Sequence, residues 1–281
     1  PSGRTASSIS AGVFHTCAVL DDASAYCWGW NGKGQLGDGT TTDSSTPVAV
    51  SLPSGRFASS VSAGHYHTCA ILDNASLYCW GDNAEGKLGD GTTTTSSTPV
   101  GVDLGTGRSA VAISAGGYHT CAILDDASIK CWGINNYGNL GDGTTESTCE
   151  SSCTPPVSVD LGTGRTAIAI SLGITHSCAI LDDNSLKCWG YGRNGELGRG
   201  SYSDSSTPVL VSLPSSRTAV AVAAGQTHTC AILDNLSVQC WGDNRDGQLG
   251  IGFFGSGTNT EELTPVYVNL SGNLAAVSER D

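Results

Sequence analysis

The tripeptide Cys-Trp-Gly occurs five times in this chain, beginning at Cys27, Cys79, Cys131, Cys188 and Cys240. Successive copies are 52, 52, 57 and 52 residues apart. A fixed period of this length is typical of solenoids and propellers, in which each repeat buries its apolar faces against its neighbours. The period predicts a single repeat domain over residues 1–281 with units at 1–52, 53–104, 105–161, 162–213 and 214–270, followed by a surplus strand or tail at 271–281.

Each unit offers about four short apolar runs separated by turn residues. In the first unit these runs predict strands at residues 6–10, 16–20, 25–29 and 47–50. Four short strands make one small sheet, which must stack on neighbouring sheets to hide its faces. We therefore expect an all-β fold, a five-bladed β-propeller of four-stranded antiparallel blades. Extra residues at 146–156 and 251–263 fall in the same part of the unit and predict surface loops.

Three elements recur in a constant order, namely Gly-x-x-His, Trp-Gly-x-Asn-x-x-Gly-x-Leu-Gly and Pro-Val-x-Val. In the first unit they lie around His15, Trp28, Asn31, Gly34, Leu36 and Pro47. Over nearly the whole chain these elements resemble the regulator-of-chromosome-condensation repeat family. The resemblance implies a propeller of four-stranded blades; well-known members have seven blades, whereas this chain has five full units. The family includes a chromatin-bound exchange factor, a plant UV-B receptor and a secreted β-lactamase inhibitor, so the fold alone does not fix a function.

Ten of the 12 cysteines form pairs at a constant spacing: Cys17 with Cys27, Cys69 with Cys79, Cys121 with Cys131, Cys178 with Cys188, and Cys230 with Cys240. If each pair lies in a hairpin, its two cysteines face each other across antiparallel strands, close enough for a disulfide. The other two, Cys149 and Cys153, lie in one insertion and could pin that loop. We expect all 12 to form disulfides, which predicts an oxidising compartment, either extracellular or at the cell surface.

Zinc is the competing interpretation of these cysteines. A histidine lies two residues before the first cysteine of every pair, at His15, His67, His119, His176 and His228. Each unit would nevertheless offer only three ligands, and a Cys-x9-Cys spacing lacks the tight hook of most zinc sites. We expect the repeated histidine to be structural and hydrogen-bonded inside the blade, and we expect no metal and no cofactor.

Charge and hydropathy exclude some classes of partner. The formal net charge is −13, and the 13 Lys and Arg form no basic cluster, so we expect no nucleic-acid binding. No apolar run approaches the roughly 18 residues of a membrane span, so we expect no membrane insertion. The chain has no Met and begins at Pro1, which a removed secretory signal or a trimmed chain would each explain.

Motifs that suggest chemistry have simpler explanations, and we expect no catalytic residues. Residues 32–37 match Gly-x-Gly-x-x-Gly, but no helix pattern follows them. Asp38, Asp90 and Asp142 could bind calcium or cap their own loop, and the last two units carry Arg199 and Ile251 at this position.

Positions that vary between fixed neighbours are free to specialise. One such position precedes the repeated histidine and another follows Trp-Gly, and both adjoin turns at one end of a blade. The aromatic residues at these positions form our candidate binding face: Phe14, Trp30, Tyr66, Tyr118 and Tyr191. Blade packing is the competing explanation for them. We expect a non-enzymatic extracellular module that binds a protein partner or itself; the alternative is a lectin-like propeller that stacks a glycan on these aromatics.

The ends of the chain suggest how the ring closes. If each blade takes its Thr-Pro-Val strand from the preceding unit, the first blade lacks a strand that residues 264–268 can supply. Residues 274–278 then resemble a surplus first strand. Such a strand could pair with a neighbouring subunit or could fray as a tail.

Overall fold

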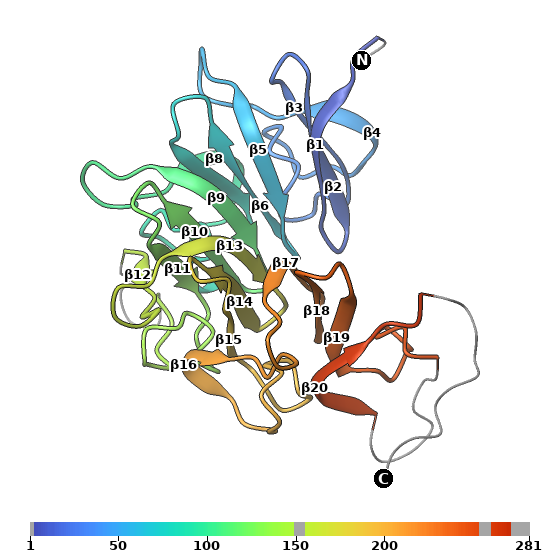
Figure 1. Cartoon of the computed structure of the whole chain (residues 1–281). Helices are drawn as coiled ribbons and strands as arrows, with labels where there is room; N and C mark the ends of the chain where they lie inside the picture. The colour runs from blue at the N-terminus through green and yellow to red at the C-terminus, as the bar shows by residue number, and fades with distance from the viewer. Residues whose placement is uncertain (1–2, 149–154, 253–259, 271–281) are drawn as a thin grey trace.

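The computed structural model describes residues 3–148, 155–252 and 260–270. Within these ranges the fold is all-β, as expected, and consists of five separate four-stranded antiparallel sheets, which we call blades 1 to 5 (Figure 1). Every blade is built from strands that are consecutive in the sequence. Tight hairpins join its first three strands, and a longer glycine-rich loop leads to the fourth.

The strands have the following bounds. Blade 1 contains β1 (Ala6–Ala11), β2 (His15–Leu20), β3 (Ala25–Gly29) and β4 (Ser44–Ala49). Blade 2 contains β5 (Ala58–Ala63), β6 (His67–Leu72), β7 (Leu77–Gly81) and β8 (Ser96–Gly101), with a 3₁₀ turn, η1 (Ala84–Gly86), in its last loop. Blade 3 contains β9 (Ala110–Ala115), β10 (His119–Leu124), β11 (Ile129–Gly133) and β12 (Val157–Ser158). Blade 4 contains β13 (Ala167–Leu172), β14 (His176–Leu181), β15 (Leu186–Gly190) and β16 (Ser205–Leu210). Blade 5 contains β17 (Ala219–Ala224), β18 (His228–Leu233), β19 (Val238–Asp243) and β20 (Glu261–Tyr267).

The central hairpin of each blade has its register fixed by a short turn. In blade 1, the Asp22 carboxylate accepts hydrogen bonds from the amide and the hydroxyl of Ser24, at 3.1 and 2.5 Å. This turn places Cys17 directly opposite Cys27, with their Cα atoms 4.1 Å apart and their sulfurs bonded. The same arrangement joins the other four predicted pairs: Cys69–Cys79, Cys121–Cys131, Cys178–Cys188 and Cys230–Cys240. Cys149 and Cys153 lie outside the described residues.

Consecutive blades are joined by a buried network that crosses from one unit to the next. Between blades 1 and 2, the main-chain oxygen of Gln35 accepts hydrogen bonds from Trp80 Nε1 and Thr68 Oγ1, both at 2.8 Å. His15 Nε2 lies 2.7 Å from the same Thr68 hydroxyl. Because that hydroxyl already donates its proton to Gln35, the histidine donates through Nε2. We call this set the interblade network.

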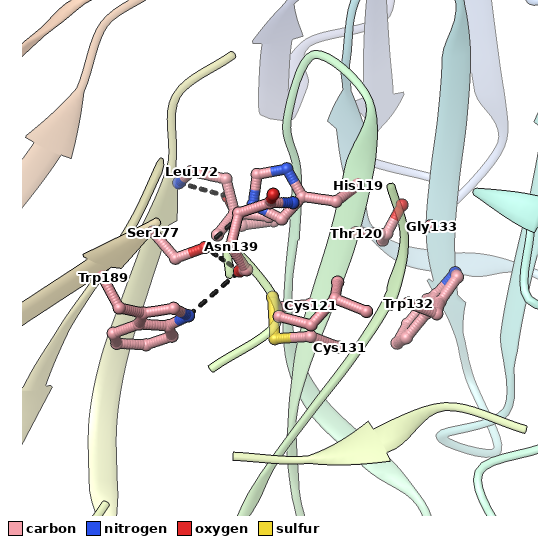
Figure 2. The surroundings of a disulfide bond; sticks show 12 residues. His119, Thr120, Cys121, Cys131, Trp132, Gly133, Asn139, Leu172, Ser177 and Trp189 are labelled. Carbon is pink, nitrogen blue, oxygen red and sulfur yellow. Dashed lines mark hydrogen bonds between the residues drawn. A yellow bond between two sulfur atoms is a disulfide. The ribbon is translucent and has the colours of Figure 1, made fainter. Parts of the chain in front are cut away.

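The interblade network is repeated at each of the next three junctions. Figure 2 shows the junction between blades 3 and 4, where the Asn139 carbonyl accepts from Trp189 and Ser177, and His119 lies 2.8 Å from Ser177 Oγ. Burial lowers the pKa of His119 to about 3. The corresponding histidines His15 and His176 have pKa values lowered to about 4 and about 3 by burial, and that of His67 is also well below its usual value. The repeated histidine is therefore an uncharged structural donor.

The blades are arranged in an arc around their first strands. β1, β5, β9, β13 and β17 contact one another in sequence, whereas blades 1 and 5 make no comparable contact within the described residues. β20 pairs with β19 of its own blade, through Cys240 opposite Val266. The expectation that residues 264–268 complete blade 1 and close a ring is therefore wrong, because every blade takes its outer strand from its own unit. Residues 274–278 lie outside the described part of the chain.

Candidate recognition face

The two variable positions meet at one end of every blade. In blade 1, the amide of Trp30 donates a hydrogen bond to the carbonyl of Phe14 at 2.9 Å, which joins the loop after β3 to the turn before β2. Gly29, just before Trp30, has φ +116°, and a Cβ there would lie 2.5 Å from the Phe14 oxygen. The glycine of the repeated Trp-Gly is thus required for the close approach of the two segments. The corresponding bond is present in the other blades, from Asp82 to Tyr66, Ile134 to Tyr118, Tyr191 to Thr175 and Asp243 to Thr227.

Three of the predicted aromatic residues form a cluster across blades 1 and 2. The rings of Phe14 and Tyr66 are stacked with their centroids 5.5 Å apart, and the Trp30 ring meets both edge-on, at 6.0 and 5.5 Å. Together they line a recess of about 320 Å³. Phe14 is 49% exposed, so the cluster faces solvent. We call these three residues the aromatic patch.

The aromatic surface continues into blade 3 through a histidine that the sequence analysis did not single out. His65 lies between Tyr66 and Tyr118, with ring centroids 5.8 and 5.6 Å away. Its position in the unit is occupied by Val13, Gly117, Ile174 and Gln226 in the other blades. This variation among the five units could have identified the position from the sequence, because only a position outside the scaffold tolerates so many residue types.

Tyr191 does not join the aromatic patch and forms a separate cluster. Its ring meets Tyr137 edge-on at 4.9 Å, and the Arg193 guanidinium lies 5.8 Å from the Tyr191 ring centre. Asp204 holds that guanidinium at 2.9 Å. The five aromatics that the sequence grouped on one face therefore fall into a larger set on blades 1 to 3 and a smaller set with Tyr191.

An open depression of about 410 Å³ lies at the centre of this end of the molecule. The ends of all five first strands line it together with the turns that follow them, which contribute Val13, His65, Ile174 and Gln226. Its lining carries no carboxylate, lysine or arginine. Val13 and His65 directly precede Phe14 and Tyr66 in the chain, so the depression adjoins the aromatic patch.

A buried ion pair lies beside the aromatic patch in blade 2. Asp82 occupies the position that Trp30 has in blade 1, and its carboxylate lies 2.5 Å from Lys87 Nζ and 3.7 Å from Lys33 Nζ. Lys87 is only 1% exposed, and burial lowers its pKa despite this partner. The pair places fixed polar groups next to the Tyr66 main chain, to which Asp82 also donates its amide.

The aspartates of the glycine-rich loop are used within the loop itself. Asp38 Oδ1 accepts hydrogen bonds from the amide and hydroxyl of Thr40, both at 2.9 Å, and from Asn31 Nδ2 at 3.3 Å. Asp90 and Asp142 make the same bonds to Thr92 and Thr144. Across the described residues, no group of three or more His, Cys, Asp or Glu is arranged to hold a metal ion. The part of the chain that the structure describes also has no helix long and apolar enough to span a bilayer.

Comparison with known proteins identifies the family. The RCC1-like domain profile matches residues 1–231, and the regulator of chromosome condensation (RCC1) repeat matches residues 219–248. This chain belongs to the RCC1-like family. It is 32% identical over 244 residues to the ultraviolet-B receptor UVR8 of Arabidopsis thaliana, a match that covers 87% of this chain and 54% of the receptor. The RCC1-like chain thus spans about half the length of that relative.

Solved structures show the same fold at lower sequence identity. Human WBSCR16 is 21% identical, with a TM-score of 0.82, and the match covers 96% of this chain and 68% of that one. Yeast RCC1 (Prp20), solved bound to Kap60, is 21% identical with a TM-score of 0.78, covering 93% of this chain and 63% of that one. These likenesses show the RCC1-type propeller architecture, of which the described residues form five blades.

Proposed function

We propose that this RCC1-like chain is a non-enzymatic, extracellular protein-binding module that recognises its partner through the aromatic patch. The observation that carries the proposal is the solvent-facing cluster of Phe14, Trp30 and Tyr66 beside the central depression. Large rigid aromatic side chains contribute contact area at low entropic cost and are enriched where proteins bind one another. Yeast RCC1, which shares the fold, is itself bound by a protein, Kap60.

The extracellular location is part of the same proposal. Five disulfides, one in every blade, lie between strands; nine of their ten cysteines are buried, and Cys230 is partly buried. Stable structural disulfides form in oxidising compartments and are rare in the cytosol. The residues that line the central depression and the recess of the aromatic patch include no carboxylate, lysine or arginine, which on a protein of net charge −13 suits a partner chosen by shape rather than by charge.

The test is affinity capture from culture supernatant with three baits. These are the parent chain, Trp30→Ala, and Phe57→Ala, whose side chain is 51% exposed at the opposite end of blade 2. We expect one partner to be retained by the parent and by Phe57→Ala, and to be lost with Trp30→Ala. Equal recovery by all three baits would overturn the patch as the binding surface.

A glycan is the second candidate ligand, favoured by the shape of the recess. Three aromatic rings enclose about 320 Å³, and the Asp82–Lys33 pair supplies polar groups nearby. Sugar rings stack their apolar faces on aromatic side chains while their hydroxyls bond to such groups. A glycan array separates the candidates: binding that disappears in Trp30→Ala supports a lectin, and a blank array excludes it. We also propose that the chain self-assembles.

A further inference from the structure

The tips of the five central hairpins differ at one position. Blades 2 and 5 have asparagine there, Asn74 and Asn235, whereas the other three blades have aspartate. A serine follows two residues later in every unit, so each of these asparagines completes the tripeptide Asn-x-Ser, at residues 74–76 and 235–237. This tripeptide, with any residue except proline in the middle, is the acceptor sequence for N-linked glycans in secreted proteins.

The fold itself does not account for asparagine at this position. Asn74 Oδ1 accepts hydrogen bonds from the amide and the hydroxyl of Ser76, at 3.2 and 2.6 Å. In blade 3, Asp126 Oδ1 accepts the same two groups of Ser128, at 3.1 and 2.6 Å. Aspartate also forms an ion pair, at 2.8 Å from Arg108, which asparagine cannot form. Neither the hydrogen bonds of the turn nor its ion pairs therefore explain the asparagines of blades 2 and 5.

The side-chain nitrogen of both asparagines is accessible. Asn74 and Asn235 are exposed, and Leu236, inside the second tripeptide, is 79% exposed. Asn235 Oδ1 accepts the amide and the hydroxyl of Ser237 at 3.1 and 2.7 Å, so both asparagines use only their oxygen in the turn. In the part of the chain that the structure describes, neither Nδ2 atom has a hydrogen-bond partner. Substitution on this nitrogen would therefore break no hydrogen bond of the fold.

Both turns lie at the end of the propeller opposite the aromatic patch. In blade 2, β6 begins at His67, next to Tyr66 of the patch, and ends at Leu72, two residues before Asn74. In blade 5, β18 runs in the same sense toward its own turn. A glycan at either tip would leave the candidate recognition face uncovered.

From the sequence and exposure of these turns we infer that Asn74 and Asn235 are acceptors of N-linked glycans. In the transfer, Nδ2 forms a bond to the anomeric carbon of an oligosaccharide carried on a lipid diphosphate. The bond between that carbon and the diphosphate oxygen breaks, the lipid diphosphate leaves, and Nδ2 gives one proton to a base of the transferase. The inference rests on the extracellular location in the proposed function and adds that one end of the propeller carries sugar while the other stays free. A third match, at Asn269, ends at Ser271, outside the described residues, and is not part of the inference.

The experiment is peptide mapping by mass spectrometry of the full chain, secreted from animal cells behind a secretion signal. The protein is digested before and after treatment with an amidase that releases N-linked glycans and converts the acceptor asparagine to aspartate. We expect the peptides that contain Asn74 and Asn235 to carry an oligosaccharide that the amidase removes. Unmodified asparagine at both positions would overturn the inference, and modification of one alone would overturn the assignment of the other.

Three variants make the assignment specific to each turn. Asn74→Asp and Asn235→Asp introduce the residue that the other blades have, so each should fold like the parent by circular dichroism and lose one glycan. Asp126→Asn creates the acceptor tripeptide at the same turn of blade 3 and should add a glycan there. A glycan that persists at residue 74 or 235 after its replacement by aspartate would contradict attachment through Nδ2.

Failure of this inference can be told apart from failure of the proposed recognition function. Trp30→Ala should lose the captured partner and keep both glycans, because the patch lies at the other end of the blades. Asn74→Asp should keep the partner and lose one glycan. A parent chain that captures its partner but carries no glycan at either turn overturns the inference alone.

Discussion

At the scale of single residues, one repeated hydrogen-bonded set holds neighbouring blades together. Thr120 illustrates it, because its hydroxyl donates to the Lys87 carbonyl at 2.9 Å and lies 2.8 Å from His67 Nε2. Trp132 donates to the same carbonyl. Removing the shared hydroxyl leaves the buried His67 Nε2 donor without an acceptor and the Lys87 carbonyl with one donor instead of two, which costs more than an average hydrogen bond contributes.

Thr120→Val should therefore lower the free energy of unfolding by about 1–3 kcal/mol. The matched control is Thr16→Val, which makes the same chemical change in β2 of blade 1, where the hydroxyl has no cross-blade partner among the described residues. That variant should cost far less. Urea denaturation of both, at a concentration that keeps the protein monomeric, measures the difference. Equal losses would show that the interblade network contributes nothing specific.

The buried histidines should make stability depend on pH. Folding lowers the pKa of His15 to about 4 and those of His119 and His176 to about 3, so the unfolded chain binds more protons below pH 6.5. Above pH 6.5 these histidines do not lower the free energy of unfolding. As the pH falls, the free energy of unfolding decreases, by about 2 kcal/mol for each such histidine at pH 5. Glu196 acts in the opposite direction, because burial raises its pKa to about 7. The histidines outnumber it, and the net effect is destabilisation by acid.

Thermal melting at pH 7.5, 6 and 5 checks this expectation. The melting temperature should fall across the series, and His119→Gln should show a shallower fall, because glutamine keeps a donor toward Ser177 but does not titrate. A melting temperature that is the same at pH 5 and pH 7.5 would contradict the assignment of neutral, buried histidines.

At the scale of strands and hairpins, much of each blade could be predicted from the sequence. The runs at 6–10, 16–20 and 25–29 agree with β1, β2 and β3 to within one residue, because their lengths are set by turns with clear signals such as Asp22 and Ser24. The cysteine spacing also indicated the register, since only one hairpin alignment places Cys17 opposite Cys27.

The partner of the outer strand could not be predicted in the same way. The residue pattern of the Thr-Pro-Val run is the same whether the strand pairs within its own unit or with the next unit. The deciding contacts come from Asn31, whose side chain accepts the Leu36 amide at 3.0 Å and donates to the Thr42 carbonyl at 3.1 Å. These bonds fold the glycine-rich loop back so that β4 returns to β3. A return over a short loop also loses less chain entropy than pairing between the two ends of the chain.

The aromatic patch could be predicted only in part. Phe14, Trp30 and Tyr66 stood out as aromatics at variable positions, and the loop bonds bring them together. Tyr191 met the same criterion but lies beside Tyr137 and Arg193. The sequence identifies the end of the blade at which a residue lies, whereas its neighbours depend on how the blades are placed around the arc.

Each hairpin disulfide should stabilise the fold through the unfolded state. Replacing Cys121 and Cys131 together by alanine should lower the free energy of unfolding by about 3 kcal/mol, the chain entropy of a loop of this size. Urea denaturation measures the loss. Peptide mapping without reductant should recover all five intrablade pairs from the parent protein. Scrambled pairs or free thiols with bound zinc would contradict the assignment.

At the scale of the whole molecule, the free energy of unfolding should be a sum of contributions from the individual blades and from the contacts between neighbouring blades. Blade 1 contacts blade 2 but makes no comparable contact with blade 5 within the described residues. Deleting residues 1–52 would expose an edge of the type that the protein already has, since Trp80 would take the place of Trp28. Nothing in the other four blades would lose a strand.

The shortened chain should therefore fold, with a urea m-value about one-fifth lower because m scales with the surface buried on folding. Deletion of residues 1–24 is the control, because it cuts blade 1 between β2 and β3 and leaves β3 without its hairpin partner β2. That variant should aggregate or bind a hydrophobic dye. A four-blade chain that is wholly unfolded would show that the arc folds only as an indivisible unit.

The self-contained construction of each blade also bears on how such chains change over generations. In the ranges that the structure describes, no sheet borrows a strand from another unit, so the copy number is not tied to a closing strand. Unequal recombination that inserts or removes one repeat of about 52 residues, at any point in the reading frame, adds or removes a complete blade and restores the same junction chemistry at the new boundary. Proteins with this architecture can gain or lose whole blades during evolution, while the sequences of the loops at the candidate recognition face change independently of blade number.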